Sequence, residues 1–261
     1  MSVQTYLERR SREAILRDDE KTSIQTSIQT LKQRLSYSGL QISESFQFGS
    51  STRGTILPRK MDEKSDIDYM IVFSDGGYNP QTYISRLKYF AEKYYSSSEI
   101  KQSHPTVVLN LNHISFDLVP AFKRSYDSEY VIPASNKSYM EWMPTSPNAF
   151  NAKLTEANKR SNSLLKPTIR LLKYWNACSN HIFSSYELEQ MITNRLFYNC
   201  YSIRDYFFDS ILNLSFDTQT ASSKTSKLMA AQNTIRQVLD YERRGELLLA
   251  ESVIKRIIPE Y

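Results

Sequence analysis

Three short segments of the chain carry the residue types and spacings best suited to chemistry. They are residues 49–55 (GSSTRGT), 65–73 (SDIDYMIVF) and 115–120 (SFDLVP). Asp66 and Asp68 are two residues apart on a predicted strand, so their side chains point to the same side. Two carboxylates this close repel each other unless a cation lies between them. Asp117, on a second predicted strand with apolar neighbours, is the natural third ligand of such a cation.

This carboxylate trio suits a magnesium site. Mg²⁺ favours oxygen ligands, and Mn²⁺ is the alternative ion. Two ions about 4 Å apart can clamp the attacking and leaving oxygens of a phosphoryl displacement. Asp117 is also the candidate general base for the attacking hydroxyl. We therefore predict a metal-bound nucleoside triphosphate and nucleotidyl transfer, whereas a strand end facing water is the competing interpretation of the Asp66–Asp68 pair alone.

The turn at Gly49 and Ser50 follows a predicted strand and is expected to open a helix. Glycine permits close approach of the backbone, and the free N–H groups at a helix start bind phosphate. A Gly-Ser turn by itself is common, and its position before the Asp pair is what makes it informative. It is not a Walker A loop, since the Gly-Lys-Ser/Thr ending is absent. Arg53 could assist phosphate binding or pair with a nearby acid, and the sequence leaves both open.

The bulk properties are those of an ordinary globular protein. The 261 residues can bury a core as one large domain or two lobes, and 40% of them are hydrophobic. No apolar run approaches the roughly 20 residues that span a bilayer, so we expect a cytoplasmic protein with no membrane insertion. The net charge of +5 favours polyanionic partners, although a solvated surface with surplus lysine explains it equally. Two cysteines and three scattered histidines argue against a structural zinc site.

The hydrophobic pattern divides the chain into two parts. Strands are predicted at residues 41–48, 67–73, 106–111 and 114–119. The second is almost continuously apolar and should be central in its sheet, and Pro120 should close the last. Helices are predicted near residues 24–35 and 83–94, and nearly everything from residue 148 onward is helical in pattern. We therefore expect two domains, 1–147 and 148–261, with an N-terminal helix that could pack on either.

These motifs, in this order, resemble the DNA polymerase β-like nucleotidyltransferase superfamily, whose pattern is Gly-Ser, two acids one residue apart, and a later acid. Within it, the chain most resembles the cGAS/DncV-like nucleotidyltransferase (CD-NTase) family. Residues 142–147 (WMPTSP) are similar to the family's connector between lobes. Residues 171–176 (LLKYWN) and 183–189 (FSSYELE) are similar to its helical-lobe signatures. The resemblance implies an α+β fold, with a mixed sheet and helices in a nucleotidyltransferase lobe and a C-terminal helical lobe.

The same resemblance implies roles for individual residues. The three carboxylates would hold two Mg²⁺ ions in an active site between the lobes. Phosphate contacts are implied for Gly49, Ser50, Lys173 and Ser185, and base stacking for Tyr186. A lysine charge, a serine hydroxyl and an aromatic face suit these tasks. Without the family resemblance, Lys173 would be interpreted as an exposed helix residue, Ser185 as a helix N-cap and Tyr186 as a core residue.

The implied activity is template-independent synthesis of a signalling oligonucleotide from NTPs or dNTPs, with release of pyrophosphate. The typical product is a cyclic di- or trinucleotide in bacterial antiphage defence, sensed by an effector protein encoded nearby. A second route is suggested by Tyr261, whose phenolic hydroxyl could accept a nucleotide and prime a chain. The Hailong-type defence nucleotidyltransferases are thought to make such linear single-stranded DNA. An incidental tyrosine, one of 18, is the competing interpretation.

An alternative function of another class is a nucleotide-binding regulator, or an antitoxin-like nucleotidyltransferase that modifies a partner protein or RNA. Minimal nucleotidyltransferases of toxin–antitoxin pairs share the Gly-Ser and Asp-x-Asp motifs. They are usually far shorter and lack an extended helical lobe, which weighs against this interpretation. The chemical nature of the product would distinguish the two functions.

Overall fold

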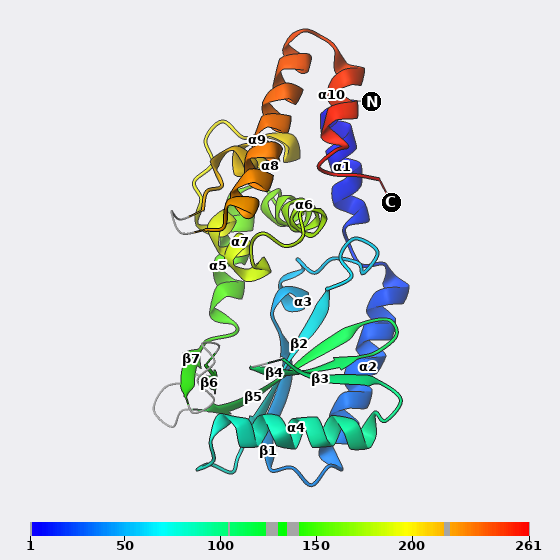
Figure 1. The fold of residues 1–261 in the computed structure, drawn as a ribbon, viewed down its shortest axis with the longest axis vertical. Coiled ribbons are helices and arrows are strands. Elements are labelled where there is room, and N and C mark those ends of the chain that lie inside the picture. Colours follow the sequence, from blue (N-terminus) through cyan, green and yellow to red (C-terminus); the bar gives the residue numbers. More distant parts are fainter. Residues whose placement is uncertain (1, 104, 124–129, 135–140, 217–219, 261) are drawn as a thin grey trace. The chain divides into compact units, whose positions relative to one another are not determined.

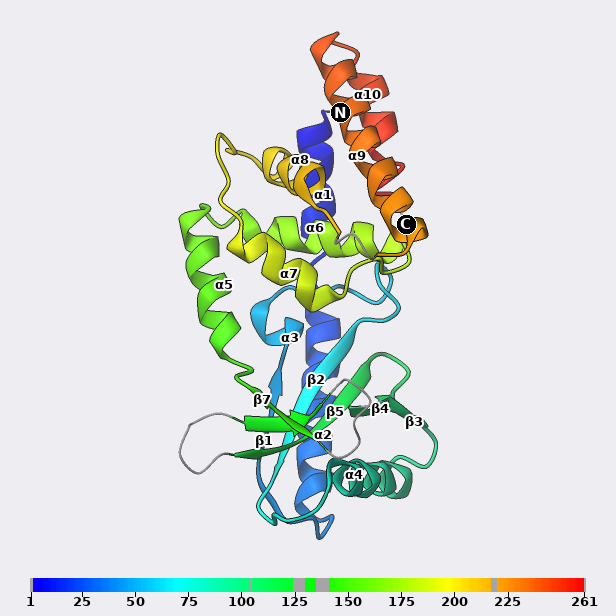
Figure 2. The same ribbon diagram turned by 60° about the vertical axis from the view of Figure 1, so that its left-hand side comes forward.

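The computed structural model describes residues 2–103, 105–123, 130–134, 141–216 and 220–260. The chain divides into two compact units. The sheet unit comprises Arg17–Arg59 and Lys64–Ala152, and the helical unit comprises Met1–Leu16, Lys60–Glu63 and Lys153–Tyr261. Figures 1 and 2 show the elements of each unit from two directions. The mixed sheet and the C-terminal helices confirm the predicted α+β class.

The sheet unit is built on a seven-stranded mixed sheet (Figure 1). Its main path runs β1-β2-β5-β4-β3, and β6 pairs with β5 and β7. Only β2 and β5 pair in parallel among the described strands. The strands are β1 (Ile42–Phe48), β2 (Asp66–Phe73), β3 (Glu99–Ser103), β4 (Thr106–Asn110), β5 (Ser115–Lys123), β6 (Tyr130–Pro133) and β7 (Trp142–Thr145).

Strand β2 is central, as its apolar sequence predicted. It lies between β1 and β5, and Ile67, Tyr69 and Ile71 are fully buried on one face. The other face changes character along the strand, from carboxylates at its start to a buried cluster of Met70, Val72 and Ala121. Burial on both faces explains the continuous apolar run, because a strand covered on two sides has no polar alternation.

The prediction that Pro120 closes β5 is wrong. The strand continues to Lys123, and Pro120 lies opposite Ile71 of β2. On its other side, β5 pairs with β4 as far as Leu118 and with β6 from Phe122 onward. Pro120 falls in the interval between these two partners, where its missing N–H interrupts neither ladder.

Three helices complete the sheet unit: α2 (Asp18–Ser36), α3 (Ser50–Arg53) and α4 (Pro80–Tyr94). The apolar stripe that predicted α2 is buried, and so is that of α4 except for Tyr94, which is partly exposed at the helix end. The start of α4 is specified by Asn79, whose side chain accepts from the Thr82 N–H at 3.0 Å, and by Pro80 in its first turn. The two helices meet where the Arg34 guanidinium lies 4.1 Å from the Tyr95 ring centroid.

The helical unit contains α1 (Val3–Glu13), most of α5 (Ala149–Arg160), α6 (Leu165–Cys178), α7 (Ser185–Asn194), α8 (Ile203–Asn213), α9 (Ser222–Arg243) and α10 (Leu247–Ile254). Its core is carried by large side chains of α6 and α8, among them Trp175 and Phe207. Among the described residues, no helix is long and apolar enough to cross a membrane.

The two units differ from the expected domains 1–147 and 148–261 in three places, the smallest being that residues 148–152 belong to the sheet unit. The first sixteen residues belong to the helical unit, and so does the segment Lys60–Glu63 between α3 and β2. That segment is held by Asp62, which is 93% buried and lies 3.4 Å from the His181 Nε2 atom after α6. Local hydrophobic pattern cannot reveal this arrangement, because it depends on contacts between residues far apart in sequence.

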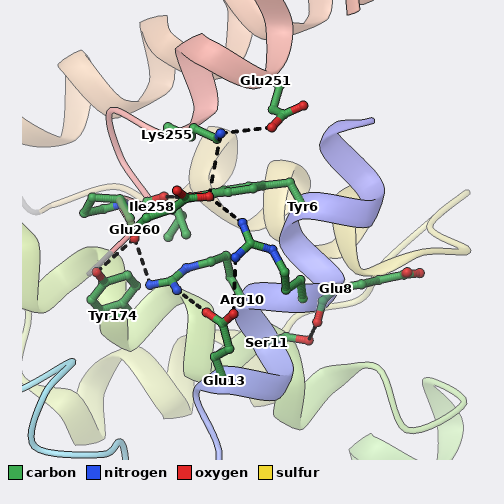
Figure 3. Close-up of polar contacts among 12 residues, drawn as sticks. Tyr6, Glu8, Arg10, Ser11, Glu13, Tyr174, Glu251, Lys255, Ile258 and Glu260 are labelled. Carbon is green, nitrogen blue, oxygen red and sulfur yellow. Dashed lines mark hydrogen bonds and ion pairs between the residues drawn. The ribbon is translucent and has the colours of Figure 1, made fainter. Parts of the chain in front are cut away.

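A polar clasp joins α1 to the segment after α10 (Figure 3). The Tyr6 hydroxyl donates to the Ile258 carbonyl at 2.5 Å, and the Arg10 guanidinium donates to the Pro259 carbonyl at 2.8 Å. The Tyr174 hydroxyl of α6 donates to the same Pro259 carbonyl at 3.0 Å. Buried donors thus satisfy backbone carbonyls that would otherwise lose their water partners.

This clasp predicts a specific alkaline sensitivity. Burial raises the pKa of Tyr6 to about 12, above the unfolded value of about 10. The stabilisation from protonated Tyr6 is therefore complete below pH 10 and is lost as the pH rises through 12. We expect Tyr6→Phe to lower the free energy of unfolding by about 1 kcal/mol at pH 8, since one hydrogen bond is lost.

At pH 11 that difference should shrink, because ionisation of Tyr6 then weakens the wild-type protein as well. Urea unfolding of both proteins at the two pH values measures this. The control is Tyr37→Phe, at a side chain that is 73% exposed. Its free energy of unfolding should stay close to that of the wild type at both pH values. A Tyr6→Phe difference that is constant with pH would contradict the assignment.

Candidate active site

The register of the parallel β2–β5 pair brings the predicted carboxylates together. Asp68 lies directly opposite Asp117, and Asp66 lies opposite Ser115. Side chains that face each other across paired strands project from the same face of the sheet, and residues two apart share that face. Asp66, Asp68 and Asp117 therefore form one carboxylate trio on one face at the start of β2.

The residues that alternate with these carboxylates pack into the core on the opposite face of the sheet. Ile67, Tyr69, Phe116 and Leu118 are fully buried on the opposite face. The Tyr69 and Phe116 rings meet edge to face with centroids 6.5 Å apart. The carboxylates are only partly buried. Apolar packing on one face thus holds three negative charges side by side on the other.

Asp117 has a distinct electrostatic environment. Burial raises its pKa above the ordinary range, and the Thr106 hydroxyl, which donates to Oδ2 at 3.4 Å, acts in the opposite direction. A carboxylate with a raised pKa is a stronger base, which suits a residue that must accept a proton. Thr106 was not identified from the sequence, because its contact with Asp117 depends on the register of the β4–β5 hairpin.

Gly49 comes into direct contact with the trio. It begins α3 with φ of +74°, a conformation that favours glycine. A Cβ atom at this position would lie 1.8 Å from Asp68 Oδ2 and 2.6 Å from Asp68 Cγ. The predicted strand–turn–helix at Gly49 and Ser50 is confirmed, and glycine is required there by both backbone and space.

Arg53 takes a position that the sequence did not indicate. It is 93% buried, and its guanidinium lies 5.2 Å from the centroid of the Phe150 ring at the start of α5. A guanidinium over an aromatic ring is a favourable contact. Within the sheet unit, Arg53 therefore ties α3 to the segment that leads into α5.

The donor set of the trio fits a hard divalent cation, since it consists of carboxylate oxygens. Among the described residues, however, no group of three or more His, Cys, Asp or Glu side chains is already arranged to hold a metal ion. The structure shows the shared face and the close backbone register of the three carboxylates, and their side chains are not converged on one point.

Lys173, predicted to contact phosphate, is paired within the helical unit. Its Nζ atom lies 3.3 Å from Glu189 Oε1, and the two side chains are 6% and 0% exposed. Breaking one partner of such a buried pair is strongly destabilising, since it leaves an uncompensated charge. The pair joins the two signature segments, because Lys173 lies on α6 and Glu189 on α7.

A second contact joins the same two segments. The Asn176 amide donates to the Phe183 carbonyl at 2.9 Å and accepts from the Phe183 N–H at 3.0 Å. Neither Asn176 nor Glu189 was assigned a role from the sequence, although both lie inside the signatures. The sequence signal that could have identified them is that both are polar residues within largely apolar segments.

Ser185 and Tyr186 lie at the start of α7. The N-cap is Ser184, whose hydroxyl accepts from the Glu187 N–H at 3.2 Å, so the capping role considered for Ser185 belongs to its neighbour. Tyr186 is 50% exposed and is not a core residue. Tyr261, the candidate primer, lies outside the described residues.

Comparison with known proteins identifies the family. The model described as Second Messenger Oligonucleotide or Dinucleotide Synthetase domain (SMODS) matches residues 1–158. A protein of Bacillus cereus (strain VD146), named as a probable cyclic nucleotide synthase, is 29% identical over 141 residues. That match covers 49% of this chain and 42% of the relative, so it spans less than half of that protein's length.

Solved structures share the fold. E. coli MS115-1 CdnC with ATP has a TM-score of 0.69 at 13% identity, covering 100% of this chain and 98% of that one. The Bradyrhizobium diazoefficiens CD-NTase CdnG in complex with GTP has a TM-score of 0.69 at 11% identity, covering 97% of each chain. The family model spans more than half of the chain and the fold agrees with it, so the chain belongs to the SMODS family and has the fold of the CD-NTase nucleotidyltransferases.

Proposed function

We propose that this chain is a template-independent nucleotidyltransferase that joins NTPs or dNTPs into a signalling oligonucleotide and releases pyrophosphate. The observation that carries the proposal is the carboxylate trio, with Asp68 opposite Asp117 on parallel strands. Family membership and the nucleotide-bound relatives support it, since CdnC is described with ATP and CdnG with GTP. Nothing in the structure favours the alternative of an antitoxin-like regulator.

In this proposal the trio holds two Mg²⁺ ions, which would neutralise the charge of the triphosphate and of the leaving pyrophosphate. Asp117 would accept the proton of the attacking hydroxyl. The hydroxyl oxygen then forms a bond to the α-phosphorus as the bond to the pyrophosphate oxygen breaks. Gly49 and Ser50 are proposed to approach the phosphates through the α3 turn.

The helical unit is proposed to supply the remaining nucleotide contacts. Tyr186, half-exposed, would stack on the base, and Ser185 would donate its hydroxyl to a phosphate. Lys173 is the least direct of these assignments, because its charge is already paired with Glu189. We propose that Glu189 orients the Lys173 side chain. The Lys173 ammonium group would then contact a phosphate while it stays paired with Glu189.

The product is proposed to be a cyclic di- or trinucleotide, which the name of the Bacillus cereus relative supports. The setting would be bacterial antiphage defence with a nearby-encoded effector, as the family resemblance implies. A linear DNA strand primed on Tyr261 is the second form of the same proposal, because the chemistry at the α-phosphate is unchanged.

The direct test is removal of two carboxylates. Asp66→Asn combined with Asp68→Asn should lower turnover of mixed NTPs and dNTPs about 1,000-fold or more, since several kcal/mol of transition-state charge stabilisation are lost. Mass spectrometry of the products measures this, and thermal melting should show a retained fold. The matched control is Asp18→Asn with Asp19→Asn at the exposed start of α2, which should keep full activity. Retained turnover in the first variant would refute the assignment.

A second test uses the contact between Gly49 and Asp68. Gly49→Ala should displace the Asp68 carboxylate and reduce turnover strongly, because the new Cβ would overlap it. The positive φ adds a backbone cost of about 1–2 kcal/mol, so a modest fall in melting temperature is expected. Gly76→Ala is the control, because no heavy atom lies within 4 Å of its Cβ position. Equal activity of the two variants would show that Gly49 does not support the site.

A third test separates the two forms of the product. If Tyr261 is the primer, labelled dNTP with Mg²⁺ should leave label on the denatured wild-type protein. Tyr261→Phe should abolish that label, because the accepting hydroxyl is absent. Tyr89→Phe, at a tyrosine that is 68% exposed, should retain it. Label that is lost on denaturation, or that persists in Tyr261→Phe, would exclude priming and leave the free cyclic product.

A further inference from the structure

The helical unit contains a pocket that the carboxylate trio does not include. Its volume is about 380 Å³, within the range of small-ligand sites in proteins. It is lined by α5, the start of α6, the end of α7 and α8, so every lining residue belongs to the helical unit. Figure 2 shows the loop between α7 and α8 passing near the C-terminal end of α5.

The lining of this pocket is cationic. Lys153, Arg160 and Arg195 contribute to it, and no carboxylate side chain does. Arg195 is held in place by Asp209, with contacts of 2.5 and 3.1 Å. Arg160 has only a 4.0 Å contact with Glu156 between two well-exposed side chains, which is a weak interaction. Lys153 and Arg160 therefore present positive charge at the rim.

The floor of the pocket is aromatic and apolar. The rings of Phe197 and Tyr206 lie 4.5 Å apart between centroids, at an angle of 37°. Tyr206 is 7% exposed and Leu165 is 1% exposed, so this floor is built into the core of the unit. An anionic group at the rim and a flat ring on the floor would both be accommodated.

The loop beside the pocket exposes large side chains to an unusual degree. Leu196, Tyr198 and Tyr201 are 68%, 75% and 83% exposed. Between them, Asn199 has a φ of +55°, which turns the backbone. Exposed aromatic rings next to a basic groove are the combination that binds successive bases of single-stranded nucleic acid.

We propose that this α5–α8 pocket binds a nucleotide unit at a site separate from the carboxylate trio. Lys153 and Arg160 contact the phosphate, the base lies on the partly exposed Phe197, which Tyr206 supports from the core, and Tyr198 and Tyr201 stack on neighbouring bases. The shared chemistry is a nucleoside phosphate, whether a free nucleotide or one unit of a strand. The assignment is independent of the function proposed above, since it uses none of the same residues.

Fluorescence anisotropy of the full chain tests this site. The probes are a labelled oligodeoxynucleotide of about 12 residues and a fluorescent mononucleotide, without Mg²⁺ so that no turnover occurs. Lys153→Glu with Arg160→Glu should weaken binding about tenfold or more, because two phosphate contacts become repulsive. Tyr198→Ser should weaken binding of the oligonucleotide more than that of the mononucleotide.

The matched control is Lys159→Glu with Lys224→Glu, which makes the same charge change at exposed positions of the helical unit outside the pocket. If this control weakens binding as much as the pocket variant, only general charge is involved and the proposal fails. It also fails if neither probe binds, or if the folded pocket variant binds like wild type. If the pocket variant loses binding of the oligonucleotide alone, the ligand of the pocket is a strand. If it loses binding of both probes equally, the ligand is a free nucleotide.

Discussion

The parallel pairing of β2 with β5 is the constraint on which the rest of the site depends. It places Asp68 opposite Asp117 and puts three carboxylates on one face, an arrangement that repulsion alone would disperse. The opposing force is apolar burial, since the residues between the carboxylates are fully buried on the other face. A shift of register by one residue would turn the carboxylates into that core, so the register is strongly specified.

The details around this pair are consequences of it. The turn at Gly49 must pass so close to Asp68 that no side chain fits. Pro120 is tolerated inside β5 because that strand changes partners from β4 to β6 around it. The raised pKa of Asp117 follows from the same burial that holds its strand in place.

The helical unit is organised by polar contacts between distant segments. Lys173 with Glu189 and Asn176 with Phe183 join α6 to α7, and each contact is largely buried, where an unpaired polar group would be costly. The clasp of Tyr6, Arg10 and Tyr174 on the Ile258 and Pro259 carbonyls brings α1 into the same unit (Figure 3). The signature segments therefore have a structural role in addition to the nucleotide contacts proposed for them.

Local periodicity and residue type were enough to predict the α+β class and most of the elements. The apolar run of β2, the strands at residues 106–111 and 114–119, the turn at Gly49 and the C-terminal helices were predicted from neighbouring residues, whereas β3, β6 and β7 were not. The tertiary structure decided what depends on contacts between distant residues: the partner of Lys173, the hydrogen bond from Thr106 to Asp117, and the place of α1. Residue type limits which partners are suitable, but only the folded chain selects among them.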